Sequence, residues 1–175
     1  AFPLRHTKPC VGYVFEEDER PGAFHPEKAE ALKVPRGPLW SKLQSGEPVL
    51  NSDGIMVYPE QVLGEKRKGR KFSYVTDTLA FPEIAQEVAN SDLFVCEGMF
   101  ERDLLESAKE KKHMTAEQAA QIAAHAGGIK KLALIHYSPR YTEHNLKQLL
   151  KEAQAIFHET VLSRDRALFP IEYED

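Results

Sequence analysis

Five side chains able to bind a metal ion or transfer a proton lie where secondary-structure elements are expected to begin or end. They are His6, Asp77, Glu97, His113 and His136. In layered α/β proteins, sites form just beyond the carboxyl ends of strands, because helix and loop ends open a crevice there. Two histidines and one aspartate would be a suitable partial ligand set for zinc, manganese or a similar divalent ion. The pattern therefore predicts a metal site, one that this chain holds only in part.

Each of these residues also has an ordinary interpretation. An aspartate after a strand commonly caps a turn, and a histidine at a strand end commonly makes a structural hydrogen bond. Cys96, which precedes Glu97, is expected to be a small buried apolar residue. The recurrence of such groups at successive strand ends favours the metal-site interpretation over these separate ones.

The elements that must position these residues alternate along the chain. Strands are predicted over residues 1–6, 11–15, 72–76, 93–96, 132–135, 160–162 and 167–171. Helices are predicted over residues 81–90, 102–111, 115–125 and 144–157. Thr115 and Gln118 match a capping box, and Gly127 and Gly128 follow that helix. Alternating strands and helices predict an α/β fold of stacked sheet and helix layers.

Prolines and glycines punctuate the chain from about residue 16 to residue 71, and they disfavour long elements there. Short helices over residues 27–32 and 39–43 and an extended piece over residues 54–58 fit between them. Because apolar side chains such as Trp40 favour packing, we expect an arm that protrudes, over residues 17–64, rather than a linker. The basic run 66–71 is interpreted either as a solvated loop or as a patch that contacts RNA phosphates.

Composition limits the class of protein. The 175 residues contain 23 basic and 27 acidic side chains, a net charge of −4, so bulk charge does not predict a polyanionic partner. Hydrophobic residues make up 42%, mean hydropathy is −0.47, and no apolar run approaches the length of a membrane span. Two cysteines do not make a disulfide scaffold, which favours a reducing cytoplasm. The start at Ala1, within strand-like sequence, predicts that the chain is truncated.

Several short blocks, in order, resemble a known family. They are Arg5-His6-Thr7 with Gly12-Tyr13, the acidic run 16–22, residues 34–43, Tyr74-Val75-Thr76-Asp77-Thr78, Cys96-Glu97-Gly98-Met99-Phe100, Lys112-His113-Met114-Thr115 and His136-Tyr137-Ser138-Pro139-Arg140-Tyr141. Over essentially all 175 residues the chain resembles the C-terminal portion of ribonuclease Z, the tRNA 3′-processing endonuclease of the metallo-β-lactamase superfamily. The resemblance implies the αββα sandwich of that superfamily without its N-terminal part.

The resemblance also implies roles for individual residues. His6 and His136 would each bind one of two divalent ions, zinc or alternatively manganese, and Asp77 would bridge them. His113 would donate a proton to the leaving 3′ oxygen, and Glu97 would orient it. The residues expected to bind substrate are Ser138 and Arg140 near the metals and Gly37, Pro38 and Lys42 in the arm.

The family's His-x-His-x-Asp-His motif, which supplies the remaining ligands, is not in this chain, so the chain alone is expected to have little activity. The implied partners are precursor tRNA and a second subunit of a homodimer, with no membrane. Two alternatives stay open. One is another hydrolase of the same fold, such as a phosphodiesterase or lactonase, and the other is a non-catalytic piece that docks RNA or dimerises.

Overall fold

The computed structural model describes residues 1–173, which form two compact units. The first unit contains Ala1–Glu16 and Arg70–Glu172, and the second contains Glu17–Gly69 together with Tyr173. Each unit has its own cluster of buried apolar side chains. No helix in residues 1–173 is long and apolar enough to cross a lipid bilayer.

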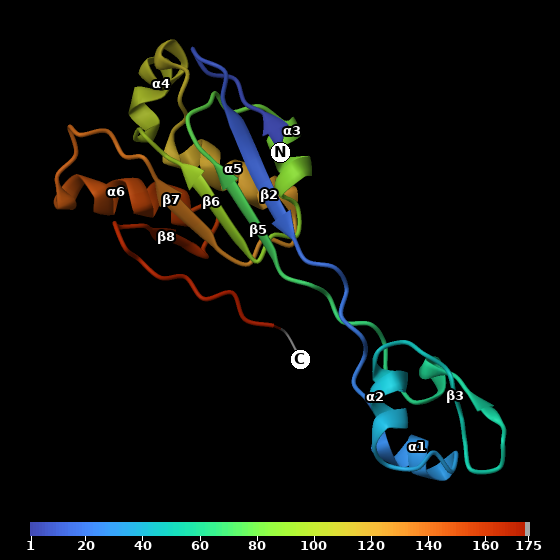
Figure 1. Cartoon of the computed structure of the whole chain (residues 1–175). Helices are drawn as coiled ribbons and strands as arrows, with labels where there is room; N and C mark the ends of the chain where they lie inside the picture. The colour runs from blue at the N-terminus through green and yellow to red at the C-terminus, as the bar shows by residue number, and fades with distance from the viewer. Residues whose placement is uncertain (174–175) are drawn as a thin grey trace. The chain divides into compact units, whose positions relative to one another are not determined.

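The first unit is built on a six-stranded sheet with the order β1-β2-β5-β6-β7-β8 (Figure 1). The strands are β1 (Phe2–Pro3), β2 (Val11–Glu16), β5 (Lys71–Val75), β6 (Leu93–Glu97), β7 (Leu132–Ile135) and β8 (Thr160–Leu162). β1, β2 and β5 pair antiparallel, whereas β5 to β8 pair parallel. Parallel neighbours need crossover connections, and helices make them here.

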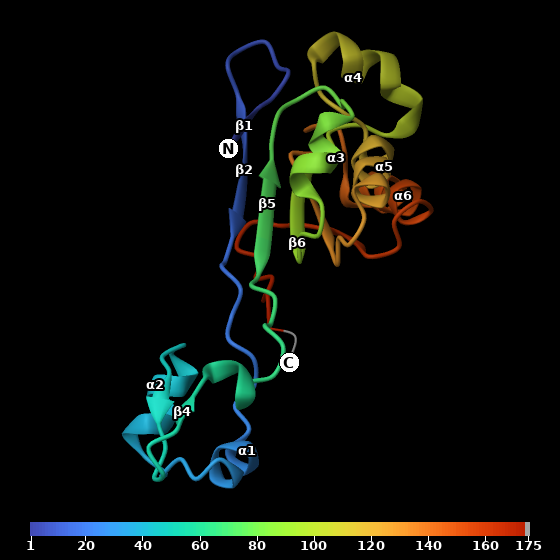
Figure 2. The ribbon, with the colours of Figure 1, turned by 90° about the vertical axis from the view of Figure 1, so that its right-hand side faces the viewer.

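Helices cover one face of this sheet, as Figure 2 shows for α3, α5 and α6. The helices of the unit are α3 (Glu83–Val88), α4 (Leu105–Lys111), α5 (Ala116–Ala126) and α6 (Glu143–Gln154), with a 3₁₀ turn η2 (Arg102–Leu104) before α4. Fully buried side chains join the two layers, among them Phe94, Leu134, Ile84, Ala120 and Leu149. One sheet and one helix layer correspond to half of an αββα sandwich.

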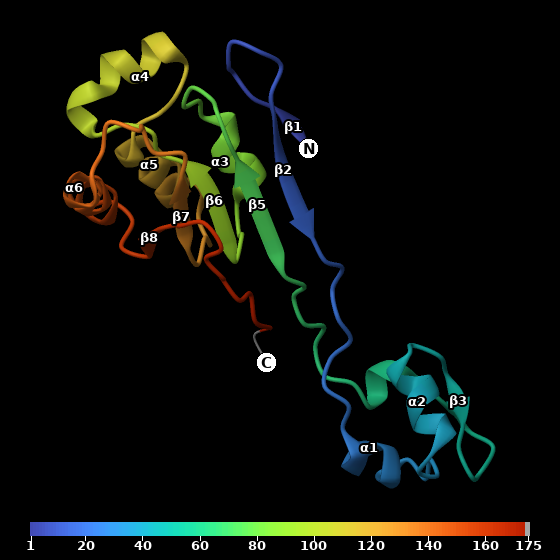
Figure 3. The ribbon, with the colours of Figure 1, turned by 60° about the vertical axis from the view of Figure 1, so that its left-hand side comes forward.

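The other face of the sheet packs against the segment that follows β8 (Figure 3). Phe169 and Ile171 of that segment contact the buried Val95 and its neighbours on β6 and β7. The predicted strand over residues 167–171 is wrong, because the structure has no strand there. Pro170 has no N–H group to donate to a strand ladder, and Arg166 has a left-handed φ of 65°. The alternating apolar residues cover the sheet without pairing with it.

Other predicted elements are present with shifted ends. The first strand is limited to Phe2–Pro3, and the helix predicted over residues 81–90 extends only over Glu83–Val88. The capping box at the start of α5 is confirmed: the Thr115 hydroxyl accepts a hydrogen bond from the Gln118 N–H at 3.1 Å, and the Gln118 side chain accepts one from the Thr115 N–H at 3.0 Å. This cap fixes the chain two residues after His113.

The second unit packs short elements around a small core. They are α1 (Pro26–Ala31), α2 (Pro38–Gln44), the hairpin strands β3 (Val49–Leu50) and β4 (Met56–Val57), and the 3₁₀ turn η1 (Pro59–Gln61). The apolar side chains buried in this core are Ala29, Val34, Leu43, Val49, Val57 and Val62. The Trp40 indole N–H donates to the Val34 carbonyl at 3.0 Å, and Phe24 packs against the Trp40 ring with centroids 5.2 Å apart. Proline-rich sequence here therefore forms a packed unit with its own core.

Two chain segments approach closely within this second unit. Arg20 and Arg67 exchange backbone hydrogen bonds of 2.7 and 2.9 Å. A Cβ added to Gly22 would lie 2.0 Å from the Gly64 carbonyl oxygen, and one added to Gly69 would lie 2.3 Å from the Glu17 carbonyl oxygen. The two glycines are required because no side chain fits between the segments.

Candidate functional site

The parallel strands bring three predicted site residues to one edge of the sheet. Val75 pairs with Cys96 and Glu97 pairs with Ile135, so the carboxyl ends of β5, β6 and β7 lie side by side. Asp77 follows β5 by two residues, Glu97 is the last residue of β6, and His136 comes directly after β7. Because the β strands are buried and apolar, their polar side chains gather where the strands end.

His6 reaches the same edge from the loop after β1. Its neighbour Arg5 is anchored there, since the Arg5 N–H donates to the Thr78 hydroxyl at 2.9 Å and the Arg5 carbonyl accepts from the Leu79 N–H at 3.0 Å. His6 Nδ1 lies 3.0 Å from the Lys112 carbonyl oxygen, an acceptor only. The hydrogen bond therefore places the proton of the neutral imidazole on Nδ1 and leaves a lone pair on Nε2, the arrangement common in metal-binding histidines.

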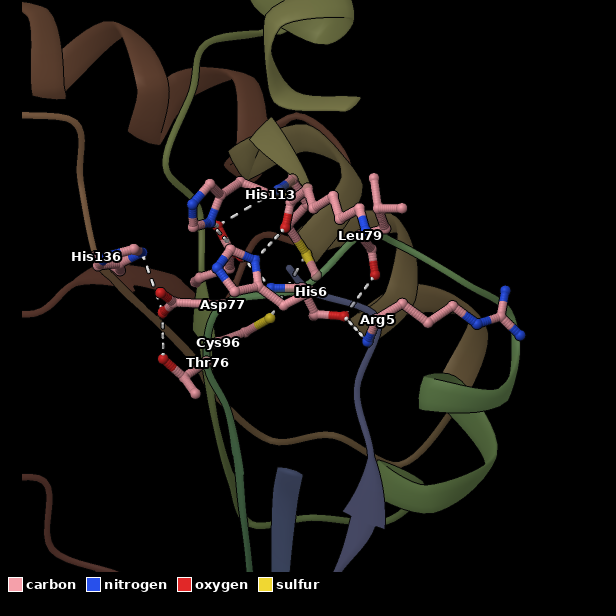
Figure 4. Close-up of polar contacts among 12 residues, drawn as sticks. Arg5, His6, Thr76, Asp77, Leu79, Cys96, His113 and His136 are labelled. Carbon is pink, nitrogen blue, oxygen red and sulfur yellow. Dashed lines mark hydrogen bonds and ion pairs between the residues drawn. The ribbon is translucent and has the colours of Figure 1, made fainter. Parts of the chain in front are cut away.

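Asp77 and His136 face one another, with 3.4 Å between Oδ1 and Nδ1 (Figure 4). The Thr76 hydroxyl donates to the same carboxylate at 2.6 Å. Burial acts to raise the pKa of Asp77, but the Thr76 hydrogen bond and the His136 charge together lower it below its ordinary value. Asp77 is thus held as a carboxylate, the form that binds a metal ion.

His136 has a left-handed backbone, with φ of 61°. This conformation is unusual for a residue other than glycine and is concentrated at functional sites. It turns the chain sharply at the end of β7.

His113 and Glu97 form a buried pair behind these groups. His113 Nδ1 lies 3.0 and 3.2 Å from the two oxygens of the Glu97 carboxylate, which is completely buried. The hydrogen bond that His113 Nδ1 donates to Glu97 raises the pKa of His113 despite the opposing effect of burial. With Nδ1 engaged by Glu97, the His113 Nε2 remains to bind or donate a proton.

The histidine rings lie close together. His113 is 4.9 Å from His6 and 5.1 Å from His136, measured between ring centroids (Figure 4). Ligand atoms of His6, Asp77 and His113 lie within 4.8 Å of one another, and so do those of Glu97, His113 and His136. Imidazole nitrogens and carboxylate oxygens at this spacing fit a divalent transition-metal ion. The structure thus brings all five predicted groups together, and His113 belongs to both sets.

The two other site residues predicted in the first unit lie on the loop after His136. Ser138 is buried, and its N–H donates to the Met99 carbonyl at 3.1 Å. Arg140 Nε donates to the Ser138 hydroxyl at 3.2 Å. Both residues thus lie on the loop that also carries a candidate ligand.

The three arm residues predicted to bind substrate belong to the second unit. Gly37 has a φ of 123° and Pro38 is the first residue of α2, so this Gly-Pro pair starts the helix. Lys42 lies in the last turn of α2 and is exposed. Their role as a tRNA-binding surface stays a prediction.

Part of the basic run is engaged in ion pairs. Lys66 pairs with Glu19 at 3.4 Å, and Lys71 pairs with Glu16 at 3.3 Å. Arg67 donates through Nε to the Pro21 carbonyl at 3.1 Å. These contacts favour a structural role for the run over that of an open phosphate-binding patch.

Sequence reasoning missed a cavity next to His136. It has a volume of about 470 Å³, and its lining includes Tyr137, Leu146, Lys147 and Arg164. Burial raises the pKa of Tyr137 to about 12, so its hydroxyl stays protonated and donates to the Leu134 carbonyl at 2.5 Å. Lys147 and Arg164 lie outside the recognisable sequence blocks, so only the folded arrangement reveals them.

The sequence matches one protein-family model and several curated proteins. A family model described as "Beta-lactamase superfamily domain" matches residues 60–137, the stretch that carries Asp77, Glu97, His113 and His136. Ribonuclease Z of Treponema denticola is 62% identical over 175 residues, which is 100% of this chain and 56% of the relative. Ribonuclease Z of Treponema pallidum (strain Nichols) is 59% identical over 174 residues, 99% of this chain and 56% of the relative. Ribonuclease Z of Borrelia recurrentis is 46% identical over 153 residues, 86% of this chain and 47% of the relative.

The family-model match, together with a sheet that gathers His and Asp ligands at its strand ends, defines a protein of the metallo-β-lactamase fold. The chain spans about half the length of the curated relatives it matches. The chain is similar to ribonuclease Z, the name that all three of these relatives carry.

Proposed function

We propose that this chain is part of a metal-dependent endoribonuclease that removes the 3′ trailer of precursor tRNA. The observation that carries the proposal is the gathering of His6, Asp77 and His136 around the His113–Glu97 pair, in a chain 62% identical to a ribonuclease Z. His6 and Asp77 share one candidate ligand set with His113, and His136 lies 3.4 Å from Asp77. The same ligands and proton-transfer groups would also suit an enzyme of this fold that cleaves other phosphodiesters. The experiment must therefore identify the substrate.

The residues divide into ligands and proton-transfer groups. His6 and His136 would hold two divalent ions, zinc or alternatively manganese, with Asp77 between them. Bound ions would supply positive charge at the phosphate and favour ionisation of the attacking water. We assign the remaining ligands to residues outside this chain, in a protein of the relatives' length.

His113 supplies the proton needed by the leaving oxygen. As the P–O3′ bond breaks, His113 Nε2–H protonates the 3′ oxygen of the tRNA body, and the water oxygen becomes part of the 5′ phosphate of the trailer. The proton that the water loses goes to solvent, from which His113 is protonated again. Glu97 fixes the His113 ring and stabilises its protonated form, as its hydrogen bond to Nδ1 and the raised pKa of His113 indicate. Ser138 and Arg140 would hold a phosphate close to the metals through their hydroxyl and guanidinium groups.

Binding of the tRNA body is assigned to the arm, residues 17–64, through Gly37, Pro38 and Lys42. We also propose that the protein is a homodimer and works in the cytoplasm, where precursor tRNA is available to it. The buried, unpaired Cys96 thiol and the half-buried Cys10 thiol fit a reducing compartment.

The test compares two substrates with a protein of full family length that carries this sequence. We expect cleavage of a precursor tRNA at the trailer junction and loss of cleavage in Asp77→Ala, while Asp103→Ala, on the exposed 3₁₀ turn η2, retains it. Hydrolysis of a chromogenic phosphodiester without cleavage of precursor tRNA would contradict the proposal and favour a small-substrate phosphodiesterase.

A further inference from the structure

A second side-chain cluster lies close in sequence to the candidate metal centre. Its members are Phe100, Lys111 and Arg140. Phe100 comes three residues after Glu97, Lys111 comes two residues before His113, and Arg140 follows the last ligand by four residues. The segments next to the candidate centre therefore also carry this cluster.

The cluster is organised around one aromatic ring. Lys111 Nζ lies 5.8 Å and Arg140 Cζ 5.3 Å from the Phe100 ring centroid, both within the range of cation–π attraction. The two positive charges are consequently no more than about 11 Å apart. Phe100 is 1% exposed, and its carbonyl accepts a hydrogen bond from the Ala116 N–H at 2.9 Å. The ring is thus a fixed platform at the start of α5.

Within the described part of the chain, the charges of this cluster have no carboxylate partner. Neither Lys111 nor Arg140 makes an ion pair with any residue in the range 1–173. By contrast, Lys109 on the same helix pairs with Glu106 at 2.8 Å. Two fixed positive charges without a counter-charge favour binding of an anion.

The cluster adjoins the candidate centre along the chain. Lys111 comes two residues before His113, and Arg140 Nε donates to the hydroxyl of Ser138, two residues after His136. An anion held at the cluster would therefore lie close to the segments that carry the proposed proton donor and the last ligand.

We propose that Lys111 and Arg140 bind a backbone phosphate of the RNA adjacent to the one being cleaved, with Phe100 as their support. The inference rests on the proposed function, because it takes RNA to be the substrate that is cleaved at the candidate centre. Arg140 offers a planar fork of donors, and Lys111 offers a compact point charge. Lys111 is thus a substrate-positioning residue. It lies outside the short sequence blocks that resemble ribonuclease Z, so the resemblance gives it no role.

The experiment measures binding of fluorescently labelled precursor tRNA to the full-length protein by anisotropy, over a series of potassium chloride concentrations. Bound metal is first removed with a chelator, so that binding is recorded without turnover. The variants are Lys111→Ala, Lys111→Arg and Arg140→Ala, with Lys109→Ala as the matched control two residues away on the same helix. Thermal unfolding of each variant checks that the fold is intact.

We expect Lys111→Ala and Arg140→Ala to bind several-fold more weakly and to reduce the slope of log affinity against log salt by about 0.7 each, the value for one phosphate contact on single-stranded RNA. Lys111→Arg should retain the wild-type slope, and so should Lys109→Ala. Equal slopes for Lys111→Ala and Lys109→Ala would overturn the inference. Failure of the wild-type protein to cleave precursor tRNA, with the slope difference intact, would overturn the proposed function and leave the anion site standing.

Discussion

The Nδ1 atom of His113 lies 3.0 Å from Oε1 of Glu97, a carboxylate with no exposed surface. The same carboxylate accepts hydrogen bonds from the backbone N–H groups of Thr78, at 2.6 Å, and Met114, at 3.4 Å. Glu97 therefore joins the loops after β5 and before α5 to the end of β6. One side chain both orients the proposed proton donor and holds together the loops around it.

Glu97→Ala should lower the free energy of unfolding by about 1–3 kcal/mol, because it leaves buried N–H groups without an acceptor. Glu97→Gln keeps a carbonyl oxygen as acceptor for those N–H groups, so its free energy of unfolding should fall by less. Urea denaturation measures both, with Glu106→Ala, at a side chain that is 86% exposed, as the control expected to stay within about 0.5 kcal/mol of wild type. An unfolding free energy for Glu97→Ala equal to that of Glu106→Ala would show that the buried carboxylate does not hold the loops.

His113→Ala in the full-length protein should slow precursor-tRNA cleavage by about 10²–10⁴-fold, the usual contribution of a general acid. The affinity for tRNA and the metal content should change little, because the proposed ligands remain. Single-turnover rates, anisotropy and elemental analysis separate the three effects, and His125→Ala on the exposed end of α5 is the control. Loss of metal from His113→Ala would instead make His113 a ligand, which its place in both ligand sets also allows.

Thr115→Ala should reduce the free energy of unfolding by about 1 kcal/mol, because it removes the hydroxyl that accepts from the Gln118 N–H at the start of α5. Thr115→Ser keeps an oxygen at that place and should restore most of the loss. Thermal or urea unfolding gives the comparison. Equal free energies of unfolding for the Thr115→Ala and Thr115→Ser variants would show that the cap does not stabilise the protein.

Much of this site was predictable from sequence, for a physical reason. Apolar strands followed within two residues by a possible ligand, as at Asp77 and His136, indicate both the strand and the edge of the sheet where the ligand lies. The match to Thr115 and Gln118 likewise located the start of α5, because the capping box depends only on local spacing. Features of this kind depend only on residues close together in the sequence, so they can be predicted without knowing the tertiary structure.

The features that sequence reasoning missed depend on contacts between distant segments. Residues 167–171 have strand-like composition, but they lie on the sheet face without pairing. The cluster of Phe100, Lys111 and Arg140 joins residues up to 40 positions apart, which no local pattern reveals. Composition also could not show that residues such as Lys66 and Lys71 in the basic run are paired with acidic partners.

Gly22→Ala should disturb the second unit, because the added Cβ would lie 2.0 Å from the Gly64 carbonyl oxygen. If this unit binds the tRNA body, the variant should lose affinity for precursor tRNA about tenfold or more while hydrolysing a chromogenic phosphodiester at the wild-type rate. Ser41→Ala, an exposed position in α2, serves as the control. Equal losses on both substrates would mean that the second unit supports the fold of the catalytic centre rather than tRNA binding.

His6, Asp77 and His136 are proposed to hold divalent metal beside the His113–Glu97 pair. The most direct test is an anomalous difference map from crystals of the full-length protein, recorded above and below the zinc absorption edge. We predict peaks within about 2.0–2.2 Å of imidazole nitrogens of His6 and His136 and of the Asp77 carboxylate. A metal-loaded, active protein whose peaks lie away from these three side chains would contradict the account.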